Sequence, residues 1–107
     1  GGKSVVSDKL NNLSFEDLEK ISSEFKALSD TSRIKIILFL LDGEKSVNAI
    51  AEKVNLTQPA TSHHLRVLKN VGILKMTRIA NENYYRVADE HISAIIKTAI
   101  THLSCED

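Results

Sequence analysis

Residues 47–74, VNAIAEKVNLTQPATSHHLRVLKNVGIL, decide the fold. The apolar residues in the first part are spaced three, one and three apart, which predicts a short helix over residues 47–54. Ser46 precedes this helix as an N-cap, and Asn55 and Leu56 form the turn that follows it. Leu56 is placed to fill the angle between this helix and the next one.

A second helix follows the turn. Thr57 is its N-cap, and Pro59 lies in its first turn, where a missing N–H costs little. The helix is expected to run to about Asn70 and to end before Gly72, which suits a C-terminal cap. Two short helices joined by a tight turn form a helix-turn-helix.

The two faces of the second helix differ in chemistry. At about 100° per residue, Thr61, Leu65 and Leu68 gather on one buried face. The opposite face is polar and cationic and carries no acid: Pro59, Ser62, His63, Arg66 and Asn70. Such a face suits the major groove of double-stranded DNA, with contacts from Thr57, Gln58, Ser62, His63 and Arg66. The alternative is an ordinary helical hairpin with a solvated face.

The charge distribution favours a nucleic-acid partner, although the 14 basic and 14 acidic residues cancel. Residues 31–86, which contain the helix-turn-helix, have nine Lys and Arg against four acids. Residues 1–30 have four Lys against six acids, and residues 87–107 have one Lys against four acids. Positive charge concentrated around the recognition helix is the electrostatic pattern of a DNA-binding protein.

The length of 107 residues suits one domain with a modest core. We expect a disordered tail over residues 1–13 and a winged helix-turn-helix DNA-binding and dimerisation domain over residues 14–107. The single cysteine excludes a disulfide within the chain and suits a reducing cytoplasm. The longest apolar run, residues 36–41, is far too short to span a membrane, so no membrane partner is expected.

The segments on either side complete the expected fold. Ser14-x-x-Asp17 begins an amphipathic helix as a capping box, and residues 29–31 separate it from a helix that is apolar nearly all round, as a central core helix should be. Residues 73–79 and 84–87 are strand-like, and the four residues between them form a polar tip. We predict a mainly α-helical winged helix-turn-helix with a small β-hairpin wing.

Arg78 lies near the tip of this wing. It is placed to reach a minor groove or phosphates, and the alternative is a solvated charge on a hairpin. Asn81 or Asn83 can adopt a positive φ, but no glycine is present, so the sequence leaves the turn type open.

A final helix is expected from Asp89 to about Ser104. Its apolar residues form one continuous stripe: Ile92, Ile95, Ile96, Ala99, Ile100 and Leu103. Because the helix before the helix-turn-helix already supplies a core, we interpret the stripe as an interface with the same helix of a second chain. We therefore expect a homodimer through the terminal helices. The alternative is that the stripe packs only on the first helix of its own chain.

Candidate metal ligands lie at both ends of this helix. His91 and His102 share one edge but are about 16 Å apart along the axis, too far to bind one ion. An antiparallel pair of helices brings residue 91 of one chain beside residue 102 of the other, at two equivalent sites. Asp89 and His91 with the second chain's His102 and Cys105 then make a tetrahedral set that suits Zn²⁺. The alternative is chance placement of two surface histidines.

The other two histidines lie in the recognition helix. We expect His63 to contact a DNA groove, and we expect His64 to lie toward the core edge and to be hydrogen-bonded within the fold.

These residues resemble the ArsR/SmtB family of metal-sensing repressors, over nearly all of the chain from Phe25 onward. FKALSDTSRI, residues 25–34, is similar to the family's entry to its second helix, and TQPATSHHL, residues 57–65, to its recognition helix. DEH at residues 89–91 with HLSC at residues 102–105 resembles the family's zinc site on the C-terminal helix. The resemblance implies a winged-helix homodimer that binds operator DNA, an inverted repeat, without metal and leaves it when metal binds.

Two positions depart from the family pattern. Residues 46–50 contain no cysteine, so a thiolate site for arsenite, lead or cadmium is not expected there. The last ligand position is more often His or Glu in the family, whereas here it is Cys105, with Glu106 as the alternative. A thiolate shifts preference toward softer ions such as Cd²⁺. The alternatives to Zn²⁺ are Cd²⁺ and Co²⁺.

We therefore expect a cytoplasmic, metal-responsive transcriptional repressor that is released from its operator by Zn²⁺. The alternatives are a winged-helix regulator without a metal site and a metal-buffering protein. The sequence has no nucleophile–base pair, phosphate-binding loop or open metal site, so an enzyme is not expected.

Overall fold

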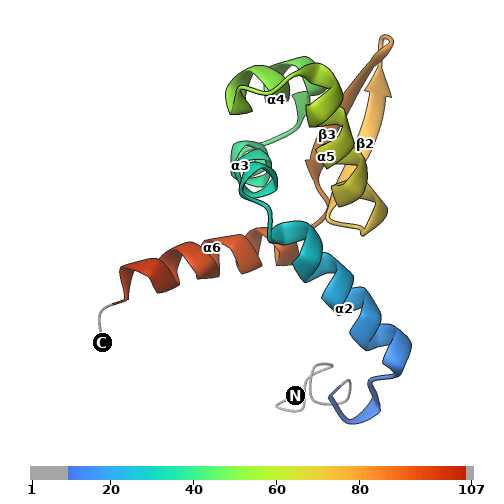
Figure 1. Ribbon diagram of the computed structural model, residues 1–107, viewed down its shortest axis with the longest axis vertical. Helices are drawn as coiled ribbons and strands as arrows, with labels where there is room; N and C mark the ends of the chain where they lie inside the picture. Colours follow the sequence, from blue (N-terminus) through green and yellow to red (C-terminus); the bar gives the residue numbers. More distant parts are fainter. Residues whose placement is uncertain (1–9, 106–107) are drawn as a thin grey trace.

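The computed structural model describes residues 10–105 (Figure 1). Of the tail that we expect to be disordered, residues 1–9 lie outside the described residues, as does Glu106, and residues 10–12 are helical. Within the described part, the elements follow in this order: α2 (Phe15–Leu28), α3 (Thr31–Leu40), β1 (Lys45–Ser46), α4 (Val47–Val54), α5 (Gln58–Asn70), β2 (Leu74–Ile79), β3 (Glu82–Val87) and α6 (Glu90–Ser104).

Each of the central helices begins where the sequence supplies a capping side chain. Ser46 Oγ accepts the backbone N–H of the third residue of α4, and Thr57 Oγ1 does the same for α5. Asn55 ends α4 in the left-handed conformation, with φ of 59°, and so makes the sharp turn between the two helices. The helix-turn-helix predicted from the sequence is confirmed, including the bounds of both helices.

The core lies where α3, α4 and α5 meet the base of the wing. On α5, the three residues predicted to be buried, Thr61, Leu65 and Leu68, are fully enclosed. They pack with apolar side chains from the neighbouring elements, including Ile36, Ile37, Leu40, Ile50, Ile73 and Leu74. This core fixes the angle at which the exposed face of α5 is presented to solvent.

The wing differs from the prediction in two respects. Its strands are joined by two residues, Ala80 and Asn81, because Glu82 already pairs with Ile79. Both turn residues have positive φ, the pattern of a type I′ turn, whose twist matches that of the flanking strands. The predicted four-residue tip over 80–83 was therefore wrong.

The wing also has a third strand that the sequence did not predict. Lys45 and Ser46 form β1, which pairs antiparallel with Tyr85 and Tyr84 of β3, giving the sheet order β1-β3-β2. Two residues are too few to show an alternating pattern, so their pairing depends on the packing of α3 and α4 rather than on local sequence.

The two terminal helices extend away from the helix-turn-helix, and their far ends point in different directions (Figure 1). α2 buries only its C-terminal residues, Ala27 and Leu28. α6 buries Ile92 and Ile96 of its predicted stripe against the core of its own chain and leaves the other four stripe residues exposed.

The helix expected to be buried nearly all round, α3, is buried on one side only. Its residues Ile34 and Leu38 are 36% and 40% exposed. Within residues 10–105, the structure contains no helix with the length and apolar character needed to cross a membrane.

Candidate nucleic-acid interface and metal ligands

A groove of about 290 Å³ runs between the helix-turn-helix and the tip of the wing. Three of the predicted DNA contacts line it together: Gln58 and Ser62 from α5, and Arg78 from β2. The rest of the lining comes from the start of α4 and from the wing: Val47, Asn48, Asn81, Glu82 and Asn83. Residues that are 20 positions apart in the sequence therefore share one polar surface.

The wing side of this groove is ordered by a cross-strand contact. Arg78 and Asn83 are paired in the β2–β3 register, and Arg78 Nη1 donates to Asn83 Oδ1 at 2.9 Å. Arg78 is exposed, and a guanidinium has further N–H groups with which it can donate to phosphate oxygens.

The other predicted DNA contacts lie outside the groove on the same helix. Thr57 is exposed at the N-terminus of α5, and His63 and Arg66 are exposed further along it. Burial raises the pKa of the Tyr85 phenol on β3, and the nearby charge of Arg66 offsets part of that rise. The predicted contacts thus extend from the groove along one exposed face of α5.

His64 lies at the core edge, as the sequence predicts, and it is hydrogen-bonded within the fold. Its Nδ1 accepts a hydrogen bond from Nε of Arg33 at 3.0 Å. This contact joins α3 to the recognition helix and makes His64 a structural residue rather than a groove contact.

At the N-terminus of α6, Asp89 and His91 lie together. Asp89 Oδ1 caps the helix by accepting the backbone N–H of His91 at 2.9 Å and that of Ile92 at 3.2 Å. The same oxygen lies 3.5 Å from Nδ1 of His91. Both side chains are largely exposed, so their remaining lone pairs are available for coordination.

At the other end of α6, His102 and Cys105 are also exposed and close in sequence, with the backbone N–H of Cys105 donating to His102 O. This pair and the pair of Asp89 and His91 lie at opposite ends of the 15-residue helix. No group of three or more potential ligands gathers anywhere within residues 10–105. Within one chain, the four predicted ligands therefore form two separate pairs.

Asn48 is a groove residue that sequence reasoning missed. It is the second residue of α4, and its Oδ1 accepts a hydrogen bond from Nε2 of Gln58 at 2.9 Å. The available signal was its place on the first turn of α4, which in a helix-turn-helix lies beside the start of the recognition helix.

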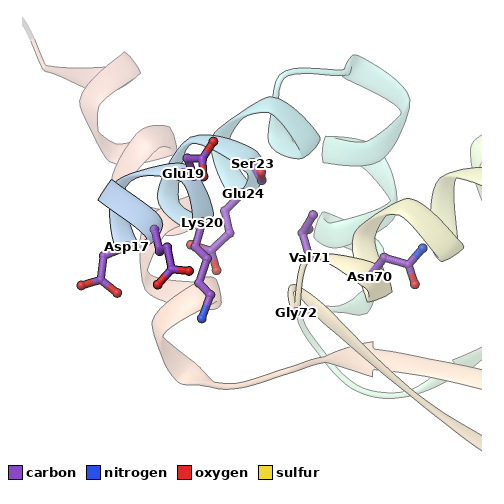
Figure 2. Close-up of a pocket in the computed structure, with 9 residues that line it drawn as sticks. Asp17, Glu19, Lys20, Ser23, Glu24, Asn70, Val71 and Gly72 are labelled. Carbon is purple, nitrogen blue, oxygen red and sulfur yellow. The ribbon is translucent and has the colours of Figure 1, made fainter. Parts of the chain in front are cut away.

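A second hollow, of about 790 Å³, lies between α2 and the turn after α5 (Figure 2). Figure 2 shows Lys20 and Glu24 of α2 on one side, and Asn70 and Val71 on the other. Its lining contains four carboxylates and one lysine: Glu16, Asp17, Glu19, Glu24 and Lys20. This negative surface repels phosphate, so DNA is expected on the groove side of the molecule.

Comparison with known proteins agrees with this geometry. Residues 30–75 match the bacterial regulatory proteins of the arsR family. A Staphylococcus aureus relative, a homologue of the cadmium resistance transcriptional regulatory protein CadC, is 39% identical over 104 residues, covering 92% of this chain and 85% of the relative. The transcriptional repressor SmtB of Mycobacterium tuberculosis is 32% identical over 87 residues, covering 81% of this chain and 64% of that protein.

Solved structures agree with the fold. The homodimeric winged helix-turn-helix DNA-binding domain of a Mycobacterium bovis protein has a TM-score of 0.77 and 28% sequence identity, covering 81% of each chain. Reduced HlyU from Vibrio cholerae has a TM-score of 0.73 and 27% identity, covering 85% of this chain and 95% of that chain.

The structure contains a helix-turn-helix with a wing beside it, and a relative matches along nearly the whole chain. These features are those of a DNA-binding regulator rather than of an enzyme. This chain belongs to the ArsR family of winged helix-turn-helix transcriptional regulators.

Proposed function

We propose that this protein is a metal-responsive transcriptional repressor. It binds operator DNA as a homodimer without metal and is released when Zn²⁺, or a similar divalent ion, binds between the two chains. The observation that carries the proposal is the groove that joins Gln58 and Ser62 of the recognition helix to Arg78 of the wing. A polar helix face beside a cationic hairpin is suited to contact a major groove and the phosphates next to it.

The exposed apolar side chains of the terminal helices support the homodimer. On α2 they are Phe15, Leu18, Ile21 and Phe25, and on α6 they are Ile95, Ile100 and Leu103. Large apolar side chains exposed along a helix are typical of a protein–protein interface. A two-fold axis near residues 96–97 relates the two recognition helices of the dimer. Two helices related in this way suit an operator with two inverted half-sites.

The chemistry of the four candidate ligands supports the metal. Asp89, His91, His102 and Cys105 offer oxygen, two nitrogens and sulfur, and a bound Zn²⁺ would supply a cross-link between chains. Cd²⁺ and Co²⁺ are the alternative ions, and the name of the Staphylococcus aureus relative refers to cadmium resistance. Each chain contributes one pair of ligands to each of two equivalent sites, so the metal response requires the dimer.

Metal and DNA oppose each other if the metal-bound dimer separates the recognition helices by a distance that the operator does not fit. The coupling free energy in such systems is about 1–3 kcal/mol, and it is reciprocal. Saturating operator DNA should therefore weaken zinc binding by the same factor by which zinc weakens DNA binding.

The test is fluorescence anisotropy of the protein on a labelled duplex, an inverted repeat selected from a random library by the metal-free protein. Added Zn²⁺ should release the duplex, and a chelator should restore binding. His102→Ala should keep DNA binding and lose the zinc response. Thr101→Ala, an exposed neighbour on the same helix, should keep both.

The alternatives give different results. Tight binding of the duplex that ignores zinc leaves a winged-helix regulator without a metal site. Zinc binding without any salt-dependent affinity for DNA leaves a metal-buffering protein. Loss of DNA binding in His102→Ala would make that residue structural.

A further inference from the structure

The hydrogen bond between Asn48 and Gln58 joins the two helices of the helix-turn-helix at their exposed face. Gln58 is the first residue of α5 and Asn48 the second of α4, and both side chains are exposed. Gln58 Nε2 donates to Asn48 Oδ1 at 2.9 Å. Both residues line the groove that leads to the tip of the wing.

This bond is not needed to hold the two helices together. The caps of α4 and α5 are supplied by Ser46 and Thr57, and the interior contact between the helices is made by buried side chains such as Ile50 and Leu65. A solvent-exposed bond between two amides adds little to stability, because water competes for both groups. Its effect is instead to restrict the orientation of the Gln58 side chain.

The bond leaves each amide with unused hydrogen-bonding groups that differ in kind. Gln58 keeps its carbonyl oxygen and one N–H of its amide, and a glutamine amide uses one acceptor and one donor to pair with N6 and N7 of adenine in the major groove. Asn48 keeps both N–H groups of its amide, which find no acceptor among residues 10–105 and suit a phosphate oxygen.

We propose that Asn48 is a positioning residue that sets base specificity: it orients Gln58 to read one adenine of the operator, and its own amide donates to a phosphate nearby. A flexible glutamine that is ordered before binding loses less conformational entropy when it meets the base. This inference rests on the proposed DNA-binding function and adds to it a base and a residue that enforces its recognition.

The test begins with a duplex selected from a random library by the wild-type protein without metal. Affinity is measured by anisotropy on this duplex and on variants in which each A·T pair in turn is replaced by G·C. For the wild type, one replacement should cost roughly 5- to 150-fold, the discrimination expected of one bidentate contact. Gln58→Ala should abolish the discrimination at that pair and leave it unchanged elsewhere.

Two substitutions at Asn48 separate its two roles. Asn48→Ala should lose most of the discrimination at the same pair, and adding it to Gln58→Ala should cause no further loss there. Asn48→Asp keeps an acceptor for Gln58, so discrimination should persist, but binding should weaken uniformly on all duplexes because the carboxylate repels phosphate. Glu52→Ala, exposed on the same helix, is the control and should keep the discrimination.

Thermal unfolding of each variant shows whether it is folded. The inference is overturned if folded Asn48→Ala keeps full discrimination, or loses it at a different pair from Gln58→Ala. It is also overturned if Asn48→Asp loses discrimination as completely as Asn48→Ala. If the wild type selects no sequence and binds no duplex, the proposed function itself fails, and this inference fails with it.

Discussion

Arg33 and His64 join the central helix α3 to the recognition helix through a single hydrogen bond, from Arg33 Nε to His64 Nδ1, over 3.0 Å. Because Nδ1 is the acceptor, the contact requires an imidazole whose proton lies on the other nitrogen. Both side chains are partly buried, so water competes less for this bond than for the exposed ones.

We expect this bond to contribute measurably to the stability of the recognition helix. In a double-mutant cycle with Arg33→Ala and His64→Ala, the coupling free energy should be about 0.5–1.5 kcal/mol, the range of a single hydrogen bond. Urea denaturation of the four proteins measures it. As a control, the same cycle with Arg33→Ala and exposed His63→Ala should give a coupling near zero.

Removal of the Thr61 hydroxyl should stabilise the protein. This residue is fully buried on α5, and its Oγ1 has no hydrogen-bond partner among residues 10–105. Thr61→Val keeps the shape and removes the unpaired polar atom, so the free energy of unfolding should rise by about 1–2 kcal/mol. Thermal unfolding should show this as a higher Tm.

Thr77→Val provides the contrast, because Thr77 Oγ1 accepts a hydrogen bond from Arg86 at 2.8 Å. That variant should be no more stable than the wild type. A lower Tm for Thr61→Val would mean that the Thr61 hydroxyl does find a partner in solution.

Asp30 should make the protein more sensitive to acid. Its carboxylate caps α3, and the backbone N–H of Arg33 is the main cause that lowers the pKa of this group below its usual value. Because the pKa of Asp30 is lower in the folded protein than in the unfolded chain, its carboxylate stabilises the folded protein at pH values above the unfolded-state pKa, which is about 4. This stabilisation is lost as the pH falls through the pKa of the folded state.

Asp30→Asn keeps a capping oxygen but does not titrate. It should therefore match the wild type at pH 7 to within about 1 kcal/mol and lose less stability than the wild type between about pH 5 and pH 3. Urea denaturation at a series of pH values measures this difference. If the free energy of unfolding falls equally with pH in the two proteins, Asp30 has no part in the acid response.

The dimer should depend on the exposed part of the α6 stripe. Ile95 is 42% exposed in the single chain, and Ile95→Glu places a charge in the proposed interface without changing the core. Sedimentation equilibrium should then give the mass of one chain, 11.9 kDa, instead of twice that mass. Thr98→Glu, exposed on the same helix but outside the stripe, should remain a dimer. A dimeric Ile95→Glu protein would place the interface elsewhere.

The limits of the helix-turn-helix were predictable because they are set by local chemistry. Ser46, Thr57 and Pro59 each act on backbone groups within one helical turn, and the sequence alone shows them. The same holds for the capping box between Ser14 and Asp17 on α2.

Features that depend on contacts between distant segments were less predictable. Ala80 adopts a positive φ that alanine disfavours, because the register of β2 and β3 leaves only two residues for the turn. The bond between Asn48 and Gln58 depends on the angle between α4 and α5, which the core sets. The residue types alone specify neither the two-residue turn nor this bond.

The candidate metal ligands illustrate a different limit. Sequence spacing puts His91 and His102 at opposite ends of α6, and the structure agrees with that separation. A site shared between two chains depends on how the chains pair, which a single chain does not determine. The four ligands therefore stay a prediction, and so does the role of the α6 stripe.

The short link between the wing and α6 has a mechanical consequence. Only Ala88 and Asp89 separate the end of β3 from the start of α6, and the N–H of Ala88 donates to Ile73 O at the base of the hairpin, over 2.9 Å. Ile92 and Ile96 fasten the first turns of the helix to the core. The start of α6 is thus tied both to the core and, through two residues, to the end of β3, the strand that pairs with the one carrying Arg78.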